Sequence, residues 1–491
     1  MAFIDGTVVN VALPAILAEF HATILDAQWV VESYALFLAA LLLAGGSLGD
    51  RFGRRRVFAI GVALFAAASI GCGLAANVRQ LIAARAIQGV GGALLVPGSL
   101  AILSASFPAN ERGRAIGTWS GFTAITAAIG PVLGGWLIDH FSWRWAFFVN
   151  VPLAAAVLVL TAWHVPESRD EAASSRLDWP GALLATVGLG GAVYALIESS
   201  QLGWKNPRVF GALTLGVLSL VSFASVERRS RAPMLPPRLF RSRNFTGANL
   251  LTLLLYAALA SVFFFFPLDL IQVQKYSAAA SGAAMLPFIL LVFLLSRWSG
   301  GLVDRFGAKK PLVVGPLIAA AGFALFAVPG IGGSYWTTFF PGMVVLGIGM
   351  ATTIAPLTTT VMGSVDAHNA GIASGINNAV SRVAGLLSVA IFSAILLHVF
   401  DRQLDRRLEN LRVRPEVRAS LDSQRTMLAA ARLPENLDPV ESGRLRRAIE
   451  ESFVSAFRWV ILMSSGLSLL AAASASWWIG GEKAKIPKHG S

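Results

Sequence analysis

Apolar runs of nearly constant length follow one another along almost the whole sequence. Each is close to the ~20 residues that a helix needs to cross ~30 Å of hydrocarbon, where only helices and closed barrels satisfy every backbone hydrogen bond. Of the 491 residues, 55% are hydrophobic and only 14% are charged, against roughly 25% charged in soluble domains. We therefore predict an all-α polytopic membrane protein with about fourteen transmembrane helices. The runs lie at residues 1–18, 28–49, 57–76, 80–105, 115–138, 145–164, 179–199, 208–226, 245–270, 279–299, 311–329, 337–361, 371–396 and 456–479.

The positions of the basic residues predict the orientation in the membrane. The net charge of +13 does not indicate a nucleic-acid partner, because the basic residues lie between apolar runs. If the loop after the second run is cytoplasmic, the short inner loops and the C-terminal tail hold about 20 Lys and Arg, and the short outer loops about 5. This bias predicts a protein of the cytoplasmic (inner) membrane with both termini in the cytoplasm. The arginine-containing segment 401–451 is then external, since long loops cross despite their charge.

The first run is short and polar for a spanning helix. Asp5 lies almost at its start, and no basic segment of a signal peptide precedes it. Because the charge bias requires this run to cross, we expect either a shortened first helix or a start that lies upstream. The single cysteine, Cys72, lies in an apolar run; it excludes a disulfide within the chain and is expected to be a small core side chain.

A sequence repeat divides the chain into two related halves. Residues 46–56 read GSLGDRFGRRR and residues 300–310 read GGLVDRFGAKK, so that the repeat is 254 residues long. Six helices with their loops need roughly 190–200 residues, which leaves about 60 residues for two extra spans. Halves related by pseudosymmetry are typical of carriers that bind their substrate at the interface between them.

The repeat predicts the domain organisation. We expect a first six-helix bundle with a shortened first helix at 1–164, and two extra helices with a basic linker at 165–244. A second six-helix bundle at 245–479 contains an external loop at 397–455, and a cytoplasmic tail follows at 480–491.

Several motifs of soluble chemistry are absent from the sequence. It contains no Gly-x-x-x-x-Gly-Lys-Ser/Thr loop, no complete Gly-x-Gly-x-x-Gly and no His-Glu-x-x-His, and its six histidines are scattered. We therefore predict neither an enzyme nor an ATP-driven pump, and neither a metal site nor a cofactor.

Four segments resemble one transporter superfamily. Residues 50–55, DRFGRR, and their repeat resemble the loop motif of the major facilitator superfamily. Residues 121–135, GFTAITAAIGPVLGG, resemble the glycine-proline antiporter motif of its exporters. Together with residues 5–14, DGTVVNVALP, and 143–152, WRWAFFVNVP, they are similar to the fourteen-helix drug:proton antiporter family. The resemblance covers almost the whole chain and fails only at the shortened N-terminus. It implies the major facilitator fold and multidrug efflux with the proton as coupling ion.

Charged residues inside the membrane are the candidates for proton coupling, because each costs ~2.5–3.5 kcal/mol at a helix centre. Asp5 is the predicted proton carrier, since a carboxyl group in a cavity can load and release a proton as the cavity changes sides; the family's matching acid supports this role. Arg85 aligns with the family's fourth-helix arginine, which implies a role in proton exchange, and a structural partner for a buried acid is the alternative. Glu32 stays open between proton relay and interfacial residue.

The loop after the second run and its repeat are predicted to act in gating. Asp50 lies at a membrane boundary beside several arginines, where it can pair with a guanidinium or cap a helix of the other half. The alternative for the arginines is that they only fix the topology. The predicted gating residues are Asp50, Arg51, Gly53, Arg54, Asp304, Arg305 and Gly307.

The fifth run combines proline with closely spaced glycines. Pro131 removes a backbone hydrogen bond, and the glycines expose backbone for close helix contact, so that we predict a bendable, tightly packed interface. Helix packing without a transport role is the alternative. The antiporter-motif residues are Gly121, Gly130, Pro131, Gly134 and Gly135. The candidates for the substrate cavity are Asn10, Gln88, Asn377 and Arg382.

The predicted function is proton-coupled export of small amphipathic compounds by alternating access. A dedicated exporter of one endogenous metabolite or siderophore is the first alternative, and a non-transporting membrane sensor, for which no effector domain is visible, is the second. The expected partners are a small-molecule substrate and the lipid bilayer. Two hypotheses on protein partners stay open, a periplasmic adaptor in an envelope-spanning efflux system and a monomer without one.

Overall fold

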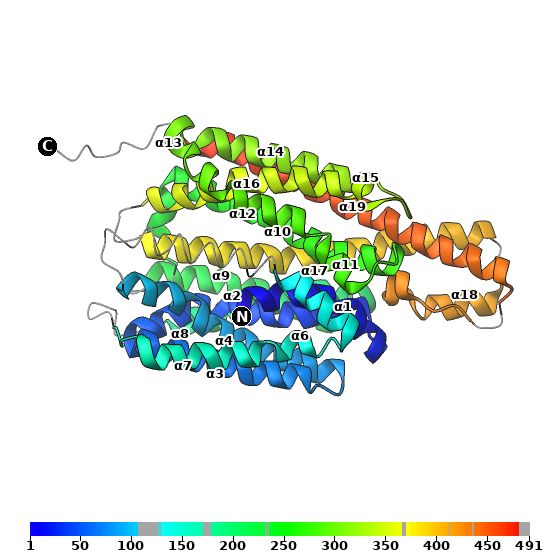
Figure 1. Cartoon of the computed structure of the whole chain (residues 1–491), viewed down its shortest axis with the longest axis horizontal. Helices are drawn as coiled ribbons and strands as arrows, with labels where there is room; N and C mark the ends of the chain where they lie inside the picture. Colours follow the sequence, from blue (N-terminus) through cyan, green and yellow to red (C-terminus); the bar gives the residue numbers. More distant parts are fainter. Residues whose placement is uncertain are drawn as a thin grey trace.

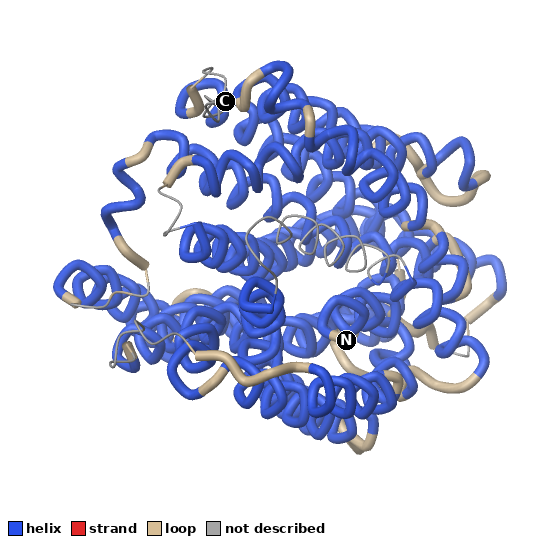
Figure 2. Tube along the Cα trace, turned by 60° about the vertical axis from the view of Figure 1, so that its left-hand side comes forward, coloured by secondary structure: helices blue, strands red, loops and turns tan. Residues whose placement is uncertain are grey.

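The computed structural model describes residues 1–106, 126, 129–169, 178–230, 233, 235–365, 370–411, 413–434 and 437–480. Across these ranges the regular secondary structure is helical (Figure 2). Twelve of the described helices are long and apolar enough to cross a membrane, and each corresponds to one of the fourteen predicted runs. The other two runs are α1 (Ala2–Phe20) and the run at 115–138, most of which lies outside the described residues.

The first half is a bundle around α4. Thr23 and Asp26 form a capping box that starts α2. Helix α4 packs against α2 and α3, and α3 packs against α7. Figure 1 shows that Met1 lies partway along the bundle, whereas α2 runs along its length. The described elements of this half are α1, α2 (Ile24–Phe52), α3 (Arg54–Gly73), α4 (Val78–Ser106), a helical segment at 129–140, α6 (Trp145–Phe148) and α7 (Asn150–His164).

Two additional helices lie between the halves in sequence, α8 (Trp179–Leu202) and α9 (Pro207–Arg229). Asp178 caps α8 and Asn206 caps α9, each followed by proline in the first turn, where its missing N–H costs no hydrogen bond. The two helices pack against each other, and α8 also contacts α2 and α17. This pair therefore touches both halves through α8.

The second half repeats the packing of the first. Helix α16 packs against α12 and α14, much as α4 packs against α2 and α3, and α10 packs against α17 and α19. The halves meet where α2 contacts α17 and where α1 contacts α10 and α11. The elements are η1 (Pro237–Arg241), α10 (Arg243–Leu268), η2 (Asp269–Val273), α11 (Ala278–Ala283), α12 (Leu286–Gly300), α13 (Leu302–Phe306), α14 (Lys309–Phe326), α15 (Tyr335–Thr338), α16 (Phe340–Gly363), α17 (Ala370–Leu411), α18 (Pro415–Asp422), η4 (Arg425–Ala430) and α19 (Pro439–Trp478).

Two helices of the second half are much longer than a membrane span. Helices α17 and α19 contain 42 and 40 residues, or about 60 Å at 1.5 Å per residue, twice the hydrocarbon thickness. Their extensions project from one end of the bundle together with α18 and η4 (Figure 1). The external loop predicted at 397–455 is thus largely helical. We call this end the α18 end; the opposite end, which carries the loops around Gly53 and Gly307, is called the loop end.

A cluster of charges holds the projecting segment together. Arg425 donates to Asp405 at 2.5 Å and to Asp422 at 2.6 Å, and Asp401 lies 3.6 Å away. Arg407 pairs with Glu451 between α17 and α19. These contacts tie the short helices to the two long ones.

Candidate functional site

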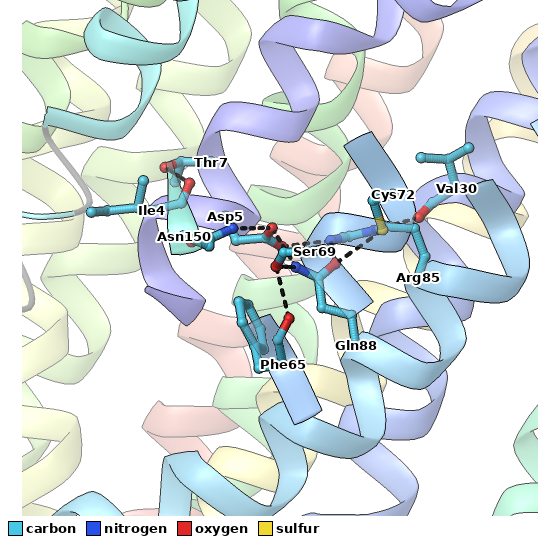
Figure 3. A network of polar contacts seen from close by, with 10 residues as sticks. All are labelled: Ile4, Asp5, Thr7, Val30, Phe65, Ser69, Cys72, Arg85, Gln88 and Asn150. Carbon is cyan, nitrogen blue, oxygen red and sulfur yellow. Dashed lines mark hydrogen bonds and ion pairs between the residues drawn. The ribbon is translucent and has the colours of Figure 1, made fainter. Parts of the chain in front are cut away.

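A buried ion pair joins α1 to α4 inside the first half. The Asp5 side chain is 0% exposed and that of Arg85 is 1% exposed, and Arg85 Nη1 lies 2.5 Å from Asp5 Oδ2 (Figure 3). Two amides complete the shell of the carboxylate: Gln88 Nε2 donates to Asp5 Oδ1 at 2.8 Å, and Asn150 Nδ2 donates to the same oxygen at 3.2 Å. The structure therefore confirms the sequence-based alternative that Arg85 is a partner for a buried acid.

The guanidinium of Arg85 is fixed from three further sides. Its Nε donates to the carbonyl oxygen of Val30 on α2 at 3.0 Å. The ring of Tyr34 lies 4.3 Å from the guanidinium carbon, and the ring of Phe147 lies 5.8 Å from it. Cation–π contacts of this kind contribute most when they are desolvated. Loss of the Asp5 charge would thus leave Arg85 in place while removing its strongest attraction.

Gln88 lies inside this network rather than along an open cavity, which corrects the sequence-based expectation for it. Its Nε2 also donates to Ser69 Oγ at 2.8 Å, while its Oε1 accepts from Arg85 Nη1 at 2.6 Å and lies 3.7 Å from Cys72 Sγ. All of its polar atoms are engaged, and the side chain is buried. Cys72 is the small buried side chain that the sequence predicts.

Asn150 and Ser69 are members of the network that the sequence did not single out. Asn150 begins α7, and Ser69 lies in α3, where its hydroxyl donates to Phe65 O at 2.8 Å. Asn150 belongs to the 143–152 segment of the family resemblance, which was the available signal for it. A single serine in an apolar helix gave none.

Glu32 lies on another face of α2. Its side chain is 1% exposed, and neither carboxylate oxygen has a hydrogen-bond partner among the described residues. This burial excludes the interfacial alternative for Glu32 in this conformation. Gln28, one helical turn earlier, is likewise 1% exposed with neither amide atom hydrogen-bonded.

The antiporter-motif glycines allow very close contacts with both halves. A Cβ atom added at Gly130 would lie 2.1 Å from Thr7 Oγ1, and one at Gly134 would lie 2.6 Å from Val8 Cγ1, both on α1. At Gly135 it would lie 2.5 Å from the carbonyl oxygen of Ala278 on α11. The segment is therefore wedged between α1 and α11.

The reciprocal contact comes from the second half. A Cβ atom at Gly282 of α11 would lie 2.1 Å from the carbonyl oxygen of Pro131, so the backbones of the two halves meet directly here. Gly121, also assigned to the motif, lies outside the described residues.

Asp139 follows this segment and caps a helix of the other half. Its Oδ1 accepts from the N–H of Ala278 at 3.1 Å, and its Oδ2 accepts from the N–H of Ala279 at 2.9 Å. Ser277 Oγ accepts from the N–H of Ala280, so that three successive amides at the start of α11 are satisfied. Sequence reasoning missed Asp139, because nothing in the sequence pairs it with residues 139 positions away.

The two repeated loops share one backbone turn. Gly53 has φ +110° and Gly307 has φ +76°, a region that L side chains rarely adopt. Asp50 pairs with Arg54 at 2.8 Å within its own loop. Of the two alternatives for Asp50, the structure therefore shows the guanidinium pair.

Other residues of these loops make local contacts. Arg51 lies over the Phe52 ring at 4.9 Å, and Arg305 lies over the Phe306 ring at 5.2 Å. The side chain of Asp304 lies outside the described part of the chain. Glu167, which the sequence did not suggest, accepts from the N–H of Arg55 at 3.1 Å and its Oε1 would lie 2.6 Å from a Cβ at position 53.

The cavity candidates of the second half lie on α17. Asn377 Nδ2 donates to Thr252 Oγ1 at 2.7 Å and to Asn249 Oδ1 at 3.1 Å on α10. Arg382 is half-buried and lies within electrostatic range of Tyr34 and Tyr256, one from each half. It therefore lies between the halves, as expected for a substrate-facing residue.

Asn10 is half-buried on α1, about 140° around the helix from Asp5 at 100° per residue, so it does not face the ion pair. Over the described residues, no group of three or more His, Cys, Asp and Glu side chains could hold a metal ion.

A bundle of two related halves that meet at their polar and glycine-rich faces is the architecture of a secondary transporter. The family model of the Major Facilitator Superfamily matches residues 1–389. The chain is 34% identical to the multidrug resistance protein Stp of Mycobacterium tuberculosis (strain CDC 1551 / Oshkosh), over 97% of this chain and 90% of that protein. It is 33% identical to the tetracenomycin C resistance and export protein of Streptomyces glaucescens, over 97% and 88%.

The puromycin resistance protein pur8 of Streptomyces alboniger is 37% identical, over 80% of this chain and 79% of that protein. Among solved structures, a bacterial homolog of the human lysosomal transporter Spinster in an inward-facing, unoccupied conformation aligns with a TM-score of 0.64 at 18% identity, over 96% of this chain and 94% of that one. The chain therefore belongs to the major facilitator superfamily, within its fourteen-helix drug:proton antiporter family.

Proposed function

We propose that this protein exports small amphipathic compounds, antibiotics and other drugs among them, across the cytoplasmic membrane in exchange for protons. The observation that carries the proposal is the buried Asp5–Arg85 ion pair with its amide shell. The names of the relatives, which refer to resistance and export, support the direction of transport. The family is one of transporters rather than enzymes.

Asp5 is the proposed proton carrier, and Arg85 sets its state. In the unprotonated form, the carboxylate is held by Arg85, Gln88 and Asn150, so α1, α4 and α7 are drawn together. A proton on Asp5 cancels the charge attraction, and Arg85 keeps its bonds to Val30 and Gln88. Proton binding thus loosens α1 from α4, which couples protonation to the packing of the first half.

Gating is proposed to occur at both ends of the bundle. At the α18 end, Asp139 and the glycine-rich segment before it hold α11 of the second half. Opening of this end would break these bonds. At the loop end, the glycine turns at Gly53 and Gly307 and the Asp50–Arg54 pair give each half the same compact loop, which is proposed to move with its half.

The α18 end is proposed to face the outside, with both termini in the cytoplasm. The loop end carries the basic clusters of residues 51–56 and 305–310, which the positive-inside rule assigns to the cytoplasm. At a membrane potential of about 150 mV, one inward charge supplies roughly 3.5 kcal/mol, enough for a gradient of a few hundredfold in a neutral substrate. A periplasmic adaptor, if the chain has one, would meet α18 first.

The second candidate function is dedicated export of one compound, an endogenous metabolite or siderophore. Two of the relatives are named for a single antibiotic, tetracenomycin C and puromycin. A dedicated exporter would release protons in response to one compound of a panel, whereas a multidrug exporter would respond to several.

Substrate-induced proton release from proteoliposomes tests the proposal. The wild-type chain is compared with Asp5→Asn across lipophilic cations, neutral compounds and anions, and Glu409→Gln, an exposed acid on α17, is the control. We expect release by the wild type and the control and none by Asp5→Asn. Unchanged release by Asp5→Asn would move the proton site elsewhere, to Glu32 first, and no release with any compound would contradict antiport.

A further inference from the structure

Gln28 and Glu32 form a second buried polar site that the Asp5 network does not include. They are four residues apart on α2 and so share one face of the helix. Each side chain is 1% exposed, and none of their four polar atoms has a hydrogen-bond partner within the described residues. Buried polar groups are nearly always hydrogen-bonded in proteins, so adjacent side chains without any partner indicate a missing ligand.

The position of this face identifies it as part of the interface between the halves. Leu43, three turns after Glu32 on the same face, lies 3.4 Å from the site of a Cβ at Gly375 of α17. Val30 and Tyr34 lie on the opposite face of α2, where they hold Arg85. One face of α2 thus serves the ion pair, and the other faces the second half, where carriers of this architecture bind their substrates.

The chemistry of the two side chains defines the ligand. Glu32 offers two acceptor oxygens and a negative charge, while Gln28 offers one acceptor oxygen and two N–H donors. No described cationic side chain lies within ion-pair distance of Glu32. A protonated amine supplies both the charge and the several N–H donors that these acceptors lack. An anion or a purely apolar compound would leave the carboxylate unpaired.

We infer that Gln28 and Glu32 form the subsite that binds the protonated primary or secondary amine of a transported compound. The carboxylate of Glu32 accepts one N–H of the amine, Gln28 Oε1 accepts another, and Gln28 Nε2 donates to an oxygen near the amine. The inference rests on the proposed export of small molecules and names their chemical class. It is separate from proton transfer at Asp5, so the two sites have distinct tests.

The experiment compares amines with their N-acetylated counterparts, which have nearly the same shape but no charge. The purified full chain in proteoliposomes is given puromycin and N-acetylpuromycin, propranolol and N-acetylpropranolol, and tetraphenylphosphonium, a cation without N–H. Binding by equilibrium dialysis and proton release are measured for the wild type, Glu32→Gln, Gln28→Leu and Asp5→Asn. Ser33→Ala, which removes a neighbouring buried hydroxyl of α2 without a hydrogen-bond partner, is the matched control.

We expect the wild type and Ser33→Ala to bind at least one amine tenfold or more tightly than its acetylated counterpart. Glu32→Gln should lose this preference and Gln28→Leu should reduce it, while Asp5→Asn should keep it and lose proton release. Equal binding of amines and acetylated counterparts by the wild type would overturn the inference, as would a preference that survives in Glu32→Gln. Loss of proton release with every compound in Glu32→Gln would identify a proton site and overturn it as well. Proton release driven only by neutral compounds or anions would overturn the amine subsite but support antiport, whereas no release with any compound would refute the proposed function itself.

Discussion

The carboxylate of Asp139 caps the helix that begins at Ala278, 3.1 Å from Asp139 Oδ1 to the N–H of Ala278 and 2.9 Å from Oδ2 to the next N–H. The donor amides belong to the second half and the acceptor to the first. At the same end, the backbones meet at Gly135 and Gly282, where no side chain separates them. One polar residue and two glycines therefore join the halves at the α18 end.

Removal of the Asp139 carboxylate is expected to favour the conformation that is open at the α18 end. A capping side chain contributes about 1 kcal/mol, so Asp139→Ala should raise the open population about fivefold. The distance between spin labels at the exposed residues His140 and Trp336 measures this population after Cys72 is replaced by alanine. Ser277→Ala removes a cap of the same helix from within its own half, and it should leave the distances unchanged. Identical distance distributions in wild type and Asp139→Ala would contradict the latch.

The Asp5–Arg85 pair is expected to show strong coupling between its two residues. Asp5→Ala leaves a buried guanidinium without a counter-charge, which costs about 3–5 kcal/mol, whereas an apolar replacement of both partners costs much less. Asp5→Ala should therefore unfold at a clearly lower temperature than the Asp5→Ala/Arg85→Met double variant in detergent. Additive losses in a thermal double-mutant cycle would show that the pair is not coupled in the folded state.

Much of this architecture follows from the sequence, and the reason is physical. Hydrocarbon admits only long apolar helices, so the runs predicted the spans, and the repeated loop motif predicted the halves. The ends of α17 and α19 were placed too early, because hydropathy falls where the helices leave the membrane although helix formation continues: residues 397–411 and 439–455 are polar but helical.

The site was predictable residue by residue but not as an assembly. Asp5 and Arg85 stood out because charges within apolar runs are costly, yet their contact joins positions 80 residues apart. Ser69 and Gln28 are neutral polar residues without a spacing signal, and only packing shows that one is hydrogen-bonded in the ion-pair network and the other is buried without a partner. Gly53 was expected for gating, and its φ of +110° supplies a backbone reason for glycine that the motif alone did not.

A methyl group at Gly135 is expected to hold the halves apart. Its Cβ would lie 2.5 Å from the carbonyl oxygen of Ala278 and 2.5 Å from Ala279 Cα, and backbone atoms cannot rotate away as a side chain can. Overpacking of this kind typically costs 1–3 kcal/mol, so Gly135→Ala should reduce the transport rate about tenfold while the protein still inserts. Gly211→Ala on α9 is the control, since no described atom lies within 4 Å of its Cβ. Equal transport rates for the two variants would show that the close contact is not needed.

Arg425 is expected to organise the segment that projects at the α18 end. Hydrogen bonds to Asp405 and Asp422 raise the pKa of its guanidinium above the ordinary value, so the positive charge persists throughout the physiological range. Arg425→Ala removes that charge from among Asp401, Asp405 and Asp422, at a cost of about 1.5–3 kcal/mol per lost hydrogen bond to a charged group.

The three carboxylates would then repel one another, and the short helices between α17 and α19 should open locally without unfolding the membrane bundle. Hydrogen exchange of residues 413–434 should accelerate tenfold or more in Arg425→Ala, while exchange in α2 and α4 stays unchanged. Arg432→Ala, which removes an exposed arginine from the same segment, serves as the matched control and should exchange like the wild type. Equal protection of 413–434 in both variants would mean that the apolar contacts of buried Leu421 and Leu428, rather than the charges, hold this segment in place.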